Sequence, residues 1–286
     1  MDRRAFIGTA TALGLFAMLD AGVGHVADRR LAYHLFLPSG DAQRPMLVMV
    51  HGVSTDPATL IELTARRAAE HHTPLMAPNF HGDELEGYQR LGDAELPLVA
   101  ARALERALSE AARRLGMTPG PVDLMGFSGG GQFVHRFALF FPQLVRRVVI
   151  GAPGWYTYLD DSEGYPYGTG ASPARGELAP NVAEFLKIPK LVAVGERDVE
   201  RDDQLRTGRV DEQGRNRLER ARRWVAHVNG LSARAGLGER VALAVLPRTG
   251  HSVTQAMRQG GLAQRMFEFL DDTPPAAAAE PATRRE

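Results

Sequence analysis

The chain has 286 residues, of which 44% are hydrophobic and none is cysteine, which suits one sizeable domain without disulfides. Lysine plus arginine and aspartate plus glutamate both number 34, so the formal net charge is zero. A chain without excess positive charge has no global field to recruit nucleic acid or an anionic membrane surface. The absence of cysteine also excludes a thiol nucleophile.

The first feature in chain order is an N-terminal apolar segment. Arg3 and Arg4 precede an uncharged apolar run that ends at Leu19. The run is too short to span a bilayer comfortably, so we expect no stable membrane span, but it suits the core of an export signal. Residues 1–26 resemble a twin-arginine signal, with Gly22 to Gly24 as the best small-residue cleavage site. The predicted location is periplasmic or secreted, and the alternative is a cytoplasmic protein with an uncleaved apolar helix.

From residue 27 to residue 272 the chain alternates between short β-prone runs and helical patterns, which predicts one α/β domain. Strands interleaved with helices form a mostly parallel central sheet with helices on both faces. The predicted strands are 31–37, 46–50, 75–77, 122–125, 145–150, 191–194 and 241–246. The predicted helices are 57–71, 94–115, 129–141, 216–235 and 253–270. Residues 273–286, which begin with Thr-Pro-Pro-Ala, are predicted to be a disordered tail.

A glycine-rich pentapeptide lies where a predicted strand meets a predicted helix. Its sequence is Gly126-Phe127-Ser128-Gly129-Gly130. G-x-S-x-G in a strand, turn and helix setting makes a nucleophile elbow, a tight turn that exposes the serine hydroxyl above the sheet. The alternative is a solvated loop serine, and the flanking strand and helix argue against it. We therefore predict Ser128 as a nucleophile.

Two further polar residues, Asp198 and His251, each follow a later predicted strand. Ligands bind beyond the carboxyl ends of parallel strands, so both residues are expected at the same edge of the sheet as Ser128. A histidine titrates near neutral pH and can take the serine proton, and an aspartate can orient the imidazole. Four neighbouring acidic residues compete with the aspartate for this role: Glu196, Glu200, Asp202 and Asp203.

Together these residues resemble the α/β-hydrolase superfamily over about residues 31–270, in which the order along the chain is Ser, Asp, His. Within it the chain resembles small bacterial esterases of the polyhydroxybutyrate-depolymerase-like and dienelactone-hydrolase-like groups, although the latter use a cysteine nucleophile. The resemblance implies an α/β-hydrolase fold with a short lid or cap loop. It also assigns an oxyanion hole to the backbone amides of Gly129 and Val53, the residue after His51-Gly52. The ring of His51 is expected to hold this loop.

A long segment over residues 152–185 has no clear secondary structure and many aromatic side chains. Such a segment is usually a functional loop when aromatic residues are abundant. We predict a lid over Ser128 that shapes an apolar acyl or aromatic pocket, and the alternative is aromatic packing for stability alone. The tentative pocket residues are Trp155, Tyr156, Tyr158 and Tyr167.

The predicted function is hydrolysis of a small-molecule carboxylic ester through an acyl-enzyme on Ser128. The alternatives are amide or peptide hydrolysis by the same triad, and a non-catalytic ligand-binding or interaction protein with this fold. No histidines have metal-binding spacing such as H-E-x-x-H, so no metal and no cofactor is predicted. His135 is expected to pack within its helix, and Arg220, Arg222 and Arg223 are expected to face solvent. The sequence gives no indication of the oligomeric state.

Overall fold

The computed structural model describes residues 18–20, 31–39, 44–82, 85–201, 205, 207–238 and 240–271. Within them, eight strands form one sheet in the order β1-β2-β4-β3-β5-β6-β7-β8. β2 pairs antiparallel with β1 and β4, whereas the other neighbours are parallel. The strands are β1 (Met18–Asp20), β2 (Ala32–Phe36), β3 (Leu47–Val50), β4 (Leu75–Asn79), β5 (Val122–Phe127), β6 (Val145–Gly151), β7 (Lys190–Gly195) and β8 (Val241–Leu246).

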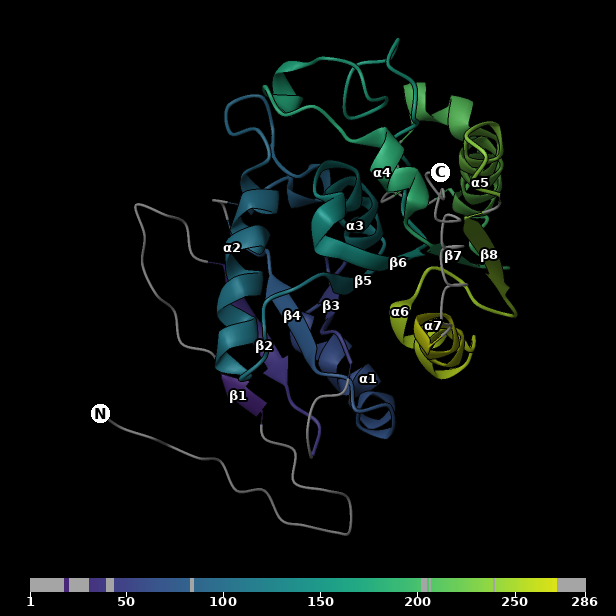
Figure 1. Cartoon of the computed structure of the whole chain (residues 1–286). Helices are drawn as coiled ribbons and strands as arrows, with labels where there is room; N and C mark the ends of the chain where they lie inside the picture. Colours follow the sequence, from purple (N-terminus) through teal and green to yellow (C-terminus); the bar gives the residue numbers. More distant parts are fainter. Residues whose placement is uncertain are drawn as a thin grey trace, which may run out of the picture.

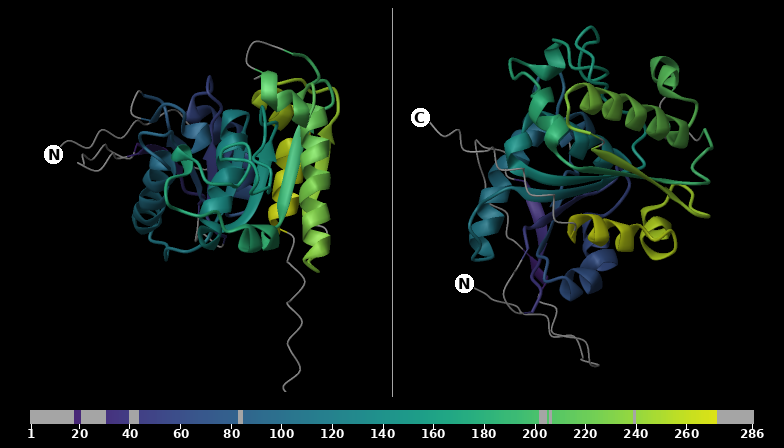
Figure 2. Two further views of the ribbon diagram at one scale, coloured as in Figure 1. Left: turned by 90° about the horizontal axis from the view of Figure 1, so that it is seen from above. Right: turned by 45° about the vertical axis from the view of Figure 1, so that its right-hand side comes forward.

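Helices cover both faces of this sheet (Figures 1 and 2). The helices are α1 (Pro57–Glu70), α2 (Val99–Arg114), α3 (Gly129–Phe140), α4 (Val182–Lys187), α5 (Arg217–Arg234), α6 (Val253–Arg258) and α7 (Leu262–Asp271). α1, α6 and α7 pack together on one face, and α2, α3, α4 and α5 lie on the other. Apolar side chains from the strands and from the inner helix faces form one continuous buried core. The predicted α/β architecture is confirmed.

Local sequence signals set several helix ends. Asp56 precedes α1, and its carboxylate accepts the amide of Ala58 at 2.9 Å. Asn216 does the same for α5, accepting the amide of Glu219 at 2.9 Å. These contacts satisfy backbone donors that the first helical turn leaves unpaired. α2 ends just before Gly116, whose φ of 68° suits the left-handed position after a helix.

The start of α2 differs from the prediction. The helix begins at Val99 rather than at Ala94. Pro97 disfavours helical conformation at the residue before it, Leu96. The carboxylate of Asp93 accepts the amide of Leu96 at 2.9 Å and so stabilises a turn at this point. The proline and the aspartate together move the start of the helix to Val99.

Two other helix predictions also need correction. The helix predicted over 253–270 is two helices, α6 and α7, which are separated at Gly260 and Gly261. Gly261 has a φ of 77°, outside the helical region. The short helix α4 lies at the end of the segment predicted to be irregular, where the side chain of Asn181 accepts the amide of Glu184 at 3.1 Å. Asparagine at this position is a strong helix-start signal.

Several predictions for the chain ends lie outside the described residues. Of the segment over residues 1–26, only Met18–Asp20 is described, and it forms β1 at the edge of the sheet beside β2. The tail over 273–286 is also outside. Within the described part of the chain, every helix is too short or too polar to cross a bilayer. Export therefore stays a prediction.

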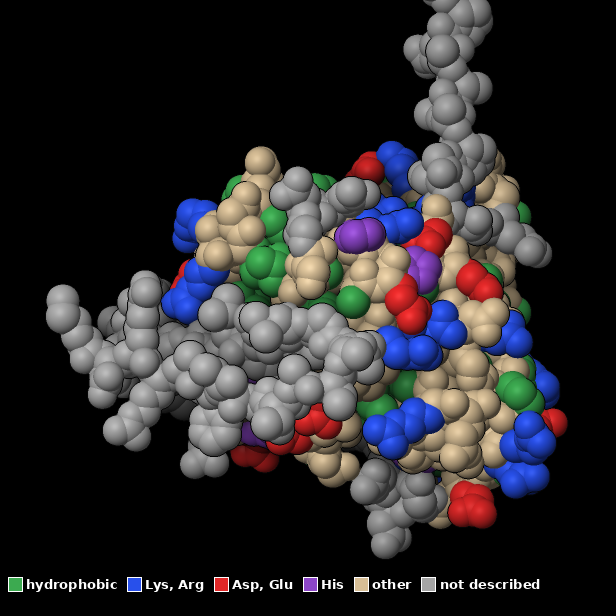
Figure 3. Space-filling model, turned by 90° about the horizontal axis from the view of Figure 1, so that it is seen from below, with side chains coloured by type: hydrophobic (Ala, Val, Ile, Leu, Met, Phe, Trp, Pro, Cys, Tyr) green, Lys and Arg blue, Asp and Glu red, His purple; other side chains and the backbone are tan. Residues whose placement is uncertain are grey.

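Basic and acidic side chains are interspersed on the face of the molecule that Figure 3 shows, wherever the described residues are visible. The view is from below the orientation of Figure 1. Mixed charge of this kind agrees with the formal net charge of zero.

Candidate active site

The predicted elbow is a sharp turn between β5 and α3. Ser128 has φ 55° and ψ −116°, and its amide donates to the carbonyl of Gly151 at 2.8 Å. Positive φ in a non-glycine residue costs on the order of 1–3 kcal/mol, so the surrounding structure must impose it. The backbones here approach very closely: a Cβ on Gly126 would lie 2.2 Å from the carbonyl oxygen of Gly130, and a Cβ on Gly130 would lie 2.0 Å from that of Val50. Only glycine fits at either position.

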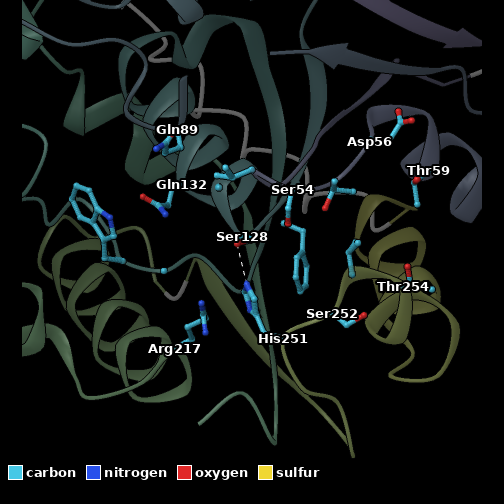
Figure 4. A pocket seen from close by; sticks show the side chains of 18 of the residues that line it. Ser54, Asp56, Thr59, Gln89, Ser128, Gln132, Arg217, His251, Ser252 and Thr254 are labelled. Carbon is cyan, nitrogen blue, oxygen red and sulfur yellow. Dashed lines mark hydrogen bonds between the residues drawn. The ribbon is translucent and has the colours of Figure 1, made fainter. Parts of the chain in front are cut away.

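The structure brings Ser128, His251 and Asp198 together at the carboxyl ends of β5, β8 and β7. The Nε2 atom of His251 lies 3.0 Å from Ser128 Oγ, as the dashed line in Figure 4 marks. The Nδ1 atom of His251 lies 2.8 Å from Asp198 Oδ2. The side chain of Asp198 is 2% exposed and that of His251 is 15% exposed, so the carboxylate is buried while the imidazole reaches the surface of a cavity.

A backbone contact determines which carboxylate meets the histidine. A Cβ on Gly195 would lie 2.2 Å from the carbonyl oxygen of Thr249, so the loops after β7 and β8 touch directly. The amide of Arg197 also donates to this carbonyl, at 2.9 Å. Glu196 points elsewhere and accepts the amide of Arg248 at 2.9 Å. The remaining competitors are exposed or outside the described residues: Glu200, Asp202 and Asp203.

The two residues assigned to the oxyanion hole are neighbours in space. A Cβ on Gly129 would lie 3.4 Å from the backbone nitrogen of Val53, and one on Gly52 would lie 3.5 Å from the Cβ of Ser128. The loop after β3 therefore lies directly against the elbow. Paired backbone N–H groups beside a nucleophile can stabilise an oxyanion.

His51 holds the loop that carries Val53. Its ring is fully buried, and its Nε2 accepts the amide of Phe80 at 3.0 Å. Burial lowers the pKa of His51 to about 4, so the ring is neutral at pH 7 and Nδ1 donates to the carbonyl of Gly52, 2.8 Å away. The hydroxyl of Tyr88 donates to the carbonyl of His51 at 2.8 Å. Three contacts thus fix one short loop.

No family model and no curated protein matches the chain. Solved structures do match it. LpqC, a poly(3-hydroxybutyrate) depolymerase from Bordetella parapertussis, aligns with a TM-score of 0.70 at 26% identity over 87% of each chain. Poly(aspartic acid) hydrolase-1 from Sphingomonas sp. KT-1 aligns with a TM-score of 0.71 at 22% identity, over 88% of this chain and 97% of its own. The Pyrococcus furiosus esterase Pf2001 aligns with a TM-score of 0.55 at 17% identity, over 89% and 92%.

The chain has the α/β-hydrolase fold. Several of the structures that resemble this chain are named as hydrolases, esterases or a depolymerase, which supports an esterase-like hydrolase as the coarse description.

The protein has a cavity of about 780 Å³ over Ser128. Figure 4 shows Gln89, Gln132 and Arg217 on one side of the serine, with hydroxyl side chains that include Thr59 and Ser252 on the other. Most of the lining side chains are polar, and Phe127, Trp155 and Val253 add apolar surface, so the cavity is more mixed than the apolar acyl or aromatic pocket that the sequence predicted. Among the described residues, no group of three or more histidine, aspartate or glutamate side chains is placed to hold a metal ion.

The prediction that four aromatic residues of the 152–185 segment line the pocket needs correction. Only Trp155 lies at the cavity. Tyr156 is fully buried and stacks on Trp224 with ring centroids 4.8 Å apart. Tyr158 packs 4.8 Å from His227, and Tyr167 stacks on Trp155 at 5.0 Å. These rings pack against one another and against α5 because burial there removes more apolar surface from water than a wet cavity wall would.

A buried arginine that the sequence did not single out supports the cavity wall. Arg136 lies in α3 and is fully buried. Its Nη1 donates to the carbonyl of Gln89 at 2.6 Å and to Gln132 Oε1 at 3.3 Å. Its guanidinium lies over the ring of Trp155, 4.1 Å from the centroid. One guanidinium therefore fixes three residues of the wall.

Two arginines of α5 also contradict the expectation of a solvated helix. Arg220 was expected to face solvent together with Arg222 and Arg223, but it is fully buried and donates to the carbonyls of Gly154 and Gly214 at 2.6 and 2.8 Å. Arg217 is also buried and lines the cavity. A sequence signal exists, because Arg217, Arg220 and Trp224 recur at helical spacing on one face.

Proposed function

We propose that the protein is a serine hydrolase of carboxylic esters that acts through an acyl-enzyme on Ser128. The observation that carries the proposal is the chain of contacts from Asp198 to His251 at 2.8 Å and from His251 to Ser128 at 3.0 Å. Both distances are within hydrogen-bond reach for proton transfer. The burial of the carboxylate and the strained conformation of the serine add support.

Each group has a definite part in the proposed reaction. His251 takes the proton of the Ser128 hydroxyl as the oxygen attacks the ester carbonyl, and Asp198 orients the ring and stabilises the imidazolium. The amides of Val53 and Gly129 donate to the oxyanion of the tetrahedral intermediate. The imidazolium then gives its proton to the leaving alcohol. Water, activated by the same histidine, attacks the acyl-enzyme and releases the acid.

Two observations favour esters with small acyl groups. Most of the side chains that line the cavity are polar, so a long alkyl chain would place part of its apolar surface against amide and hydroxyl groups. The Bordetella parapertussis structure, which carries the name of a polyester depolymerase, is 26% identical over 87% of both chains. An aminopeptidase usually holds the substrate amine with an acidic pair. Among the described residues that line the cavity, the one carboxylate is Asp56, whose oxygen accepts the amide of Ala58.

A fluorophosphonate probe tests this function directly. The wild-type protein is expected to be labelled and to hydrolyse p-nitrophenyl acetate and butyrate at least about tenfold faster than the octanoate, and Ser128→Ala is expected to abolish both labelling and turnover. The matched control is Ser162→Ala, because Ser162 is away from the cavity and pairs with Asp160. Turnover that survives in Ser128→Ala would refute the mechanism, and a wild-type protein that is neither labelled nor active would favour the non-catalytic alternative.

A further inference from the structure

An arginine lies behind the proposed catalytic acid. Arg217 is the first residue of α5, and its side chain and that of Asp198 are each 2% exposed. Its Nη1 lies 3.2 Å from Asp198 Oδ1, while Asp198 Oδ2 lies 2.8 Å from His251 Nδ1. The two oxygens of one buried carboxylate therefore contact a permanent cation on one side and the proposed base on the other.

Burial makes this contact important. A carboxylate that is withdrawn from water favours its neutral form unless a cation or several donors compensate for the lost hydration. A neutral acid beside His251 would no longer stabilise the imidazolium that forms when Ser128 attacks. A guanidinium keeps its charge at any pH at which proteins are normally folded, and its fixed planar geometry restricts the orientation of the carboxylate that it contacts.

The other ionisable neighbours do not supply this charge. Tyr156 lies close enough to Asp198 to interact with it electrostatically, but burial raises the pKa of Tyr156 well above its usual range and the phenol is neutral. Arg220, on the next turn of α5, directs its guanidinium to the carbonyls of Gly154 and Gly214 and to Asp211. Phe127 contacts the imidazole of His251 with ring centroids 5.4 Å apart and carries no charge.

We propose that Arg217 is a positioning residue for the hydrolysis, acting through Asp198. Its guanidinium compensates for the charge of the buried carboxylate and turns it so that Oδ2 faces the imidazole. The inference rests on the proposed function of Ser128, Asp198 and His251. It extends that function because it assigns a fourth side chain, from helix α5, to the positioning of the proposed catalytic acid.

Neutral and charged substitutions of Arg217 separate this role from a purely structural one. Arg217→Met and Arg217→Gln are expected to lower kcat for p-nitrophenyl acetate by about 10- to 100-fold with KM changed by less than about twofold. Both are also expected to move the acid limb of the kcat/KM pH profile to higher pH by roughly half to one pH unit. The reason is that these variants lack a nearby positive charge that opposes protonation of the Asp198–His251 pair. Arg217→Lys keeps the charge, so its acid limb should stay near that of the wild type.

The matched control is Arg222→Met, which removes an exposed arginine from the same helix and is expected to leave kcat and the pH profile unchanged. Active-site titration with the fluorophosphonate corrects every rate for misfolded protein. A reduced kcat with an unmoved acid limb in both neutral variants would overturn the inference. So would an acid limb in Arg217→Lys that moves as far as in Arg217→Met.

A double-mutant cycle decides whether Arg217 acts through Asp198. In the Asp198→Asn background, Arg217→Met is expected to change the rate of fluorophosphonate labelling by less than about twofold, because the carboxylate on which it acts is absent. An equal loss in both backgrounds would overturn the inference. Failure of the proposed function is distinguishable, since the wild-type protein itself would then not be labelled.

Discussion

The loops that carry the three proposed catalytic residues and the wall of the cavity beside them are held in place by different means. In the loops, backbone packs directly on backbone: Gly130 lies against Val50, and Gly195 lies against Thr249. In the wall, a buried guanidinium group bridges neighbouring segments through its side chain. Arg136 joins η2 (Tyr88–Arg90), α3 and Trp155 in this way.

This difference matters for how each region responds to change. A backbone contact leaves no space, so a single added methyl group displaces an entire loop. A guanidinium bridge fills space with a flexible side chain, and its loss leaves carbonyl groups without donors but does not force the segments apart. We therefore expect the loops to be intolerant of substitution and the wall to be tolerant of it.

The strongest test of the intolerant loops is Gly130→Ala. The new Cβ would meet the carbonyl oxygen of Val50 at 2.0 Å, and neither backbone has room to move. We expect a loss of more than about 4 kcal/mol in the free energy of unfolding and no measurable fluorophosphonate labelling. Urea denaturation measures the first quantity. Gly120→Ala is the control, since nothing lies within 4 Å of a Cβ there, and a similar loss in both variants would contradict the comparison.

Gly195→Ala tests the contact between the acid loop and the histidine loop. The added Cβ would lie 2.2 Å from the carbonyl oxygen of Thr249 and would separate Asp198 from His251. We expect kcat to fall by about 100-fold, because displacement of a reacting group by about 1 Å has effects of this size. Steady-state kinetics with p-nitrophenyl acetate checks the prediction. Gly250→Ala, where a Cβ would lie 3.8 Å from Gln255 Oε1, should retain wild-type activity.

The buried ring of His51 makes the loop after β3, which carries Val53, sensitive to acid. Its pKa is lowered to about 4 by burial, so between pH 6.5 and 4 the unfolded chain binds a proton that the folded chain does not. The stability that this ring contributes is therefore complete above pH 6.5 and is lost as the pH falls toward 4, by up to about 3 kcal/mol. The measurable quantity is the difference in unfolding free energy between wild type and His51→Asn, which should shrink by this amount.

The comparison uses a difference between wild type and His51→Asn because other groups also titrate between pH 6.5 and 4. Burial raises the pKa of Asp123 to about 6, and its contribution has the opposite sign, since the folded chain binds the extra proton there. Asp123 is present in both proteins, so its contribution to the pH dependence cancels in the difference between them. The exposed His72, at φ 49°, supplies the control His72→Asn, and a loss as large as that of His51→Asn would contradict the assignment to the buried ring.

The smallest effect is expected from Arg136→Met in the tolerant wall. The loss of the guanidinium removes donors from the carbonyl of Gln89 and from the side chain of Gln132. We expect a destabilisation of about 2 kcal/mol and a several-fold rise in KM with kcat nearly unchanged, because the wall contacts substrate but not the reacting bond. Arg106→Met, an exposed change on α2, is the control. A fall in kcat larger than the rise in KM would show that the wall is not independent of the loops.

The sequence predicts the loops that carry the proposed catalytic residues well and the cavity wall poorly. Glycines at 126, 130 and 195 follow β-prone runs, and a glycine that is required by a close approach is visible as a motif. The seven strands from β2 to β8 were predicted, with differences only at their ends, because each is an apolar run interrupted by turn residues. The fold could therefore be read from local patterns.

The wall depends on long-range packing, of which the sequence shows only the helical spacing of Arg217, Arg220 and Trp224 on one face of α5. Tyr156 and Trp155 are adjacent in sequence, yet one is enclosed behind the wall and the other lies at the cavity. Arg217 lines the cavity as well, although arginines on a polar helix ordinarily indicate a solvated face. The strand β1 was also missed, because three residues carry too little periodicity to distinguish a strand from the apolar run around it.

The side chain of Val53 has a thermodynamic consequence for binding. Val53 is 61% exposed, and it lines the cavity together with the apolar side chains of Phe127, Trp155 and Val253. Any ligand seated over the serine must dehydrate this isopropyl group, which contributes about 1 kcal/mol to association and makes the heat capacity change of binding more negative. Calorimetric titration of an inert ester analogue at several temperatures would therefore register this isopropyl group, although in the proposed reaction only the backbone amide of Val53 takes part.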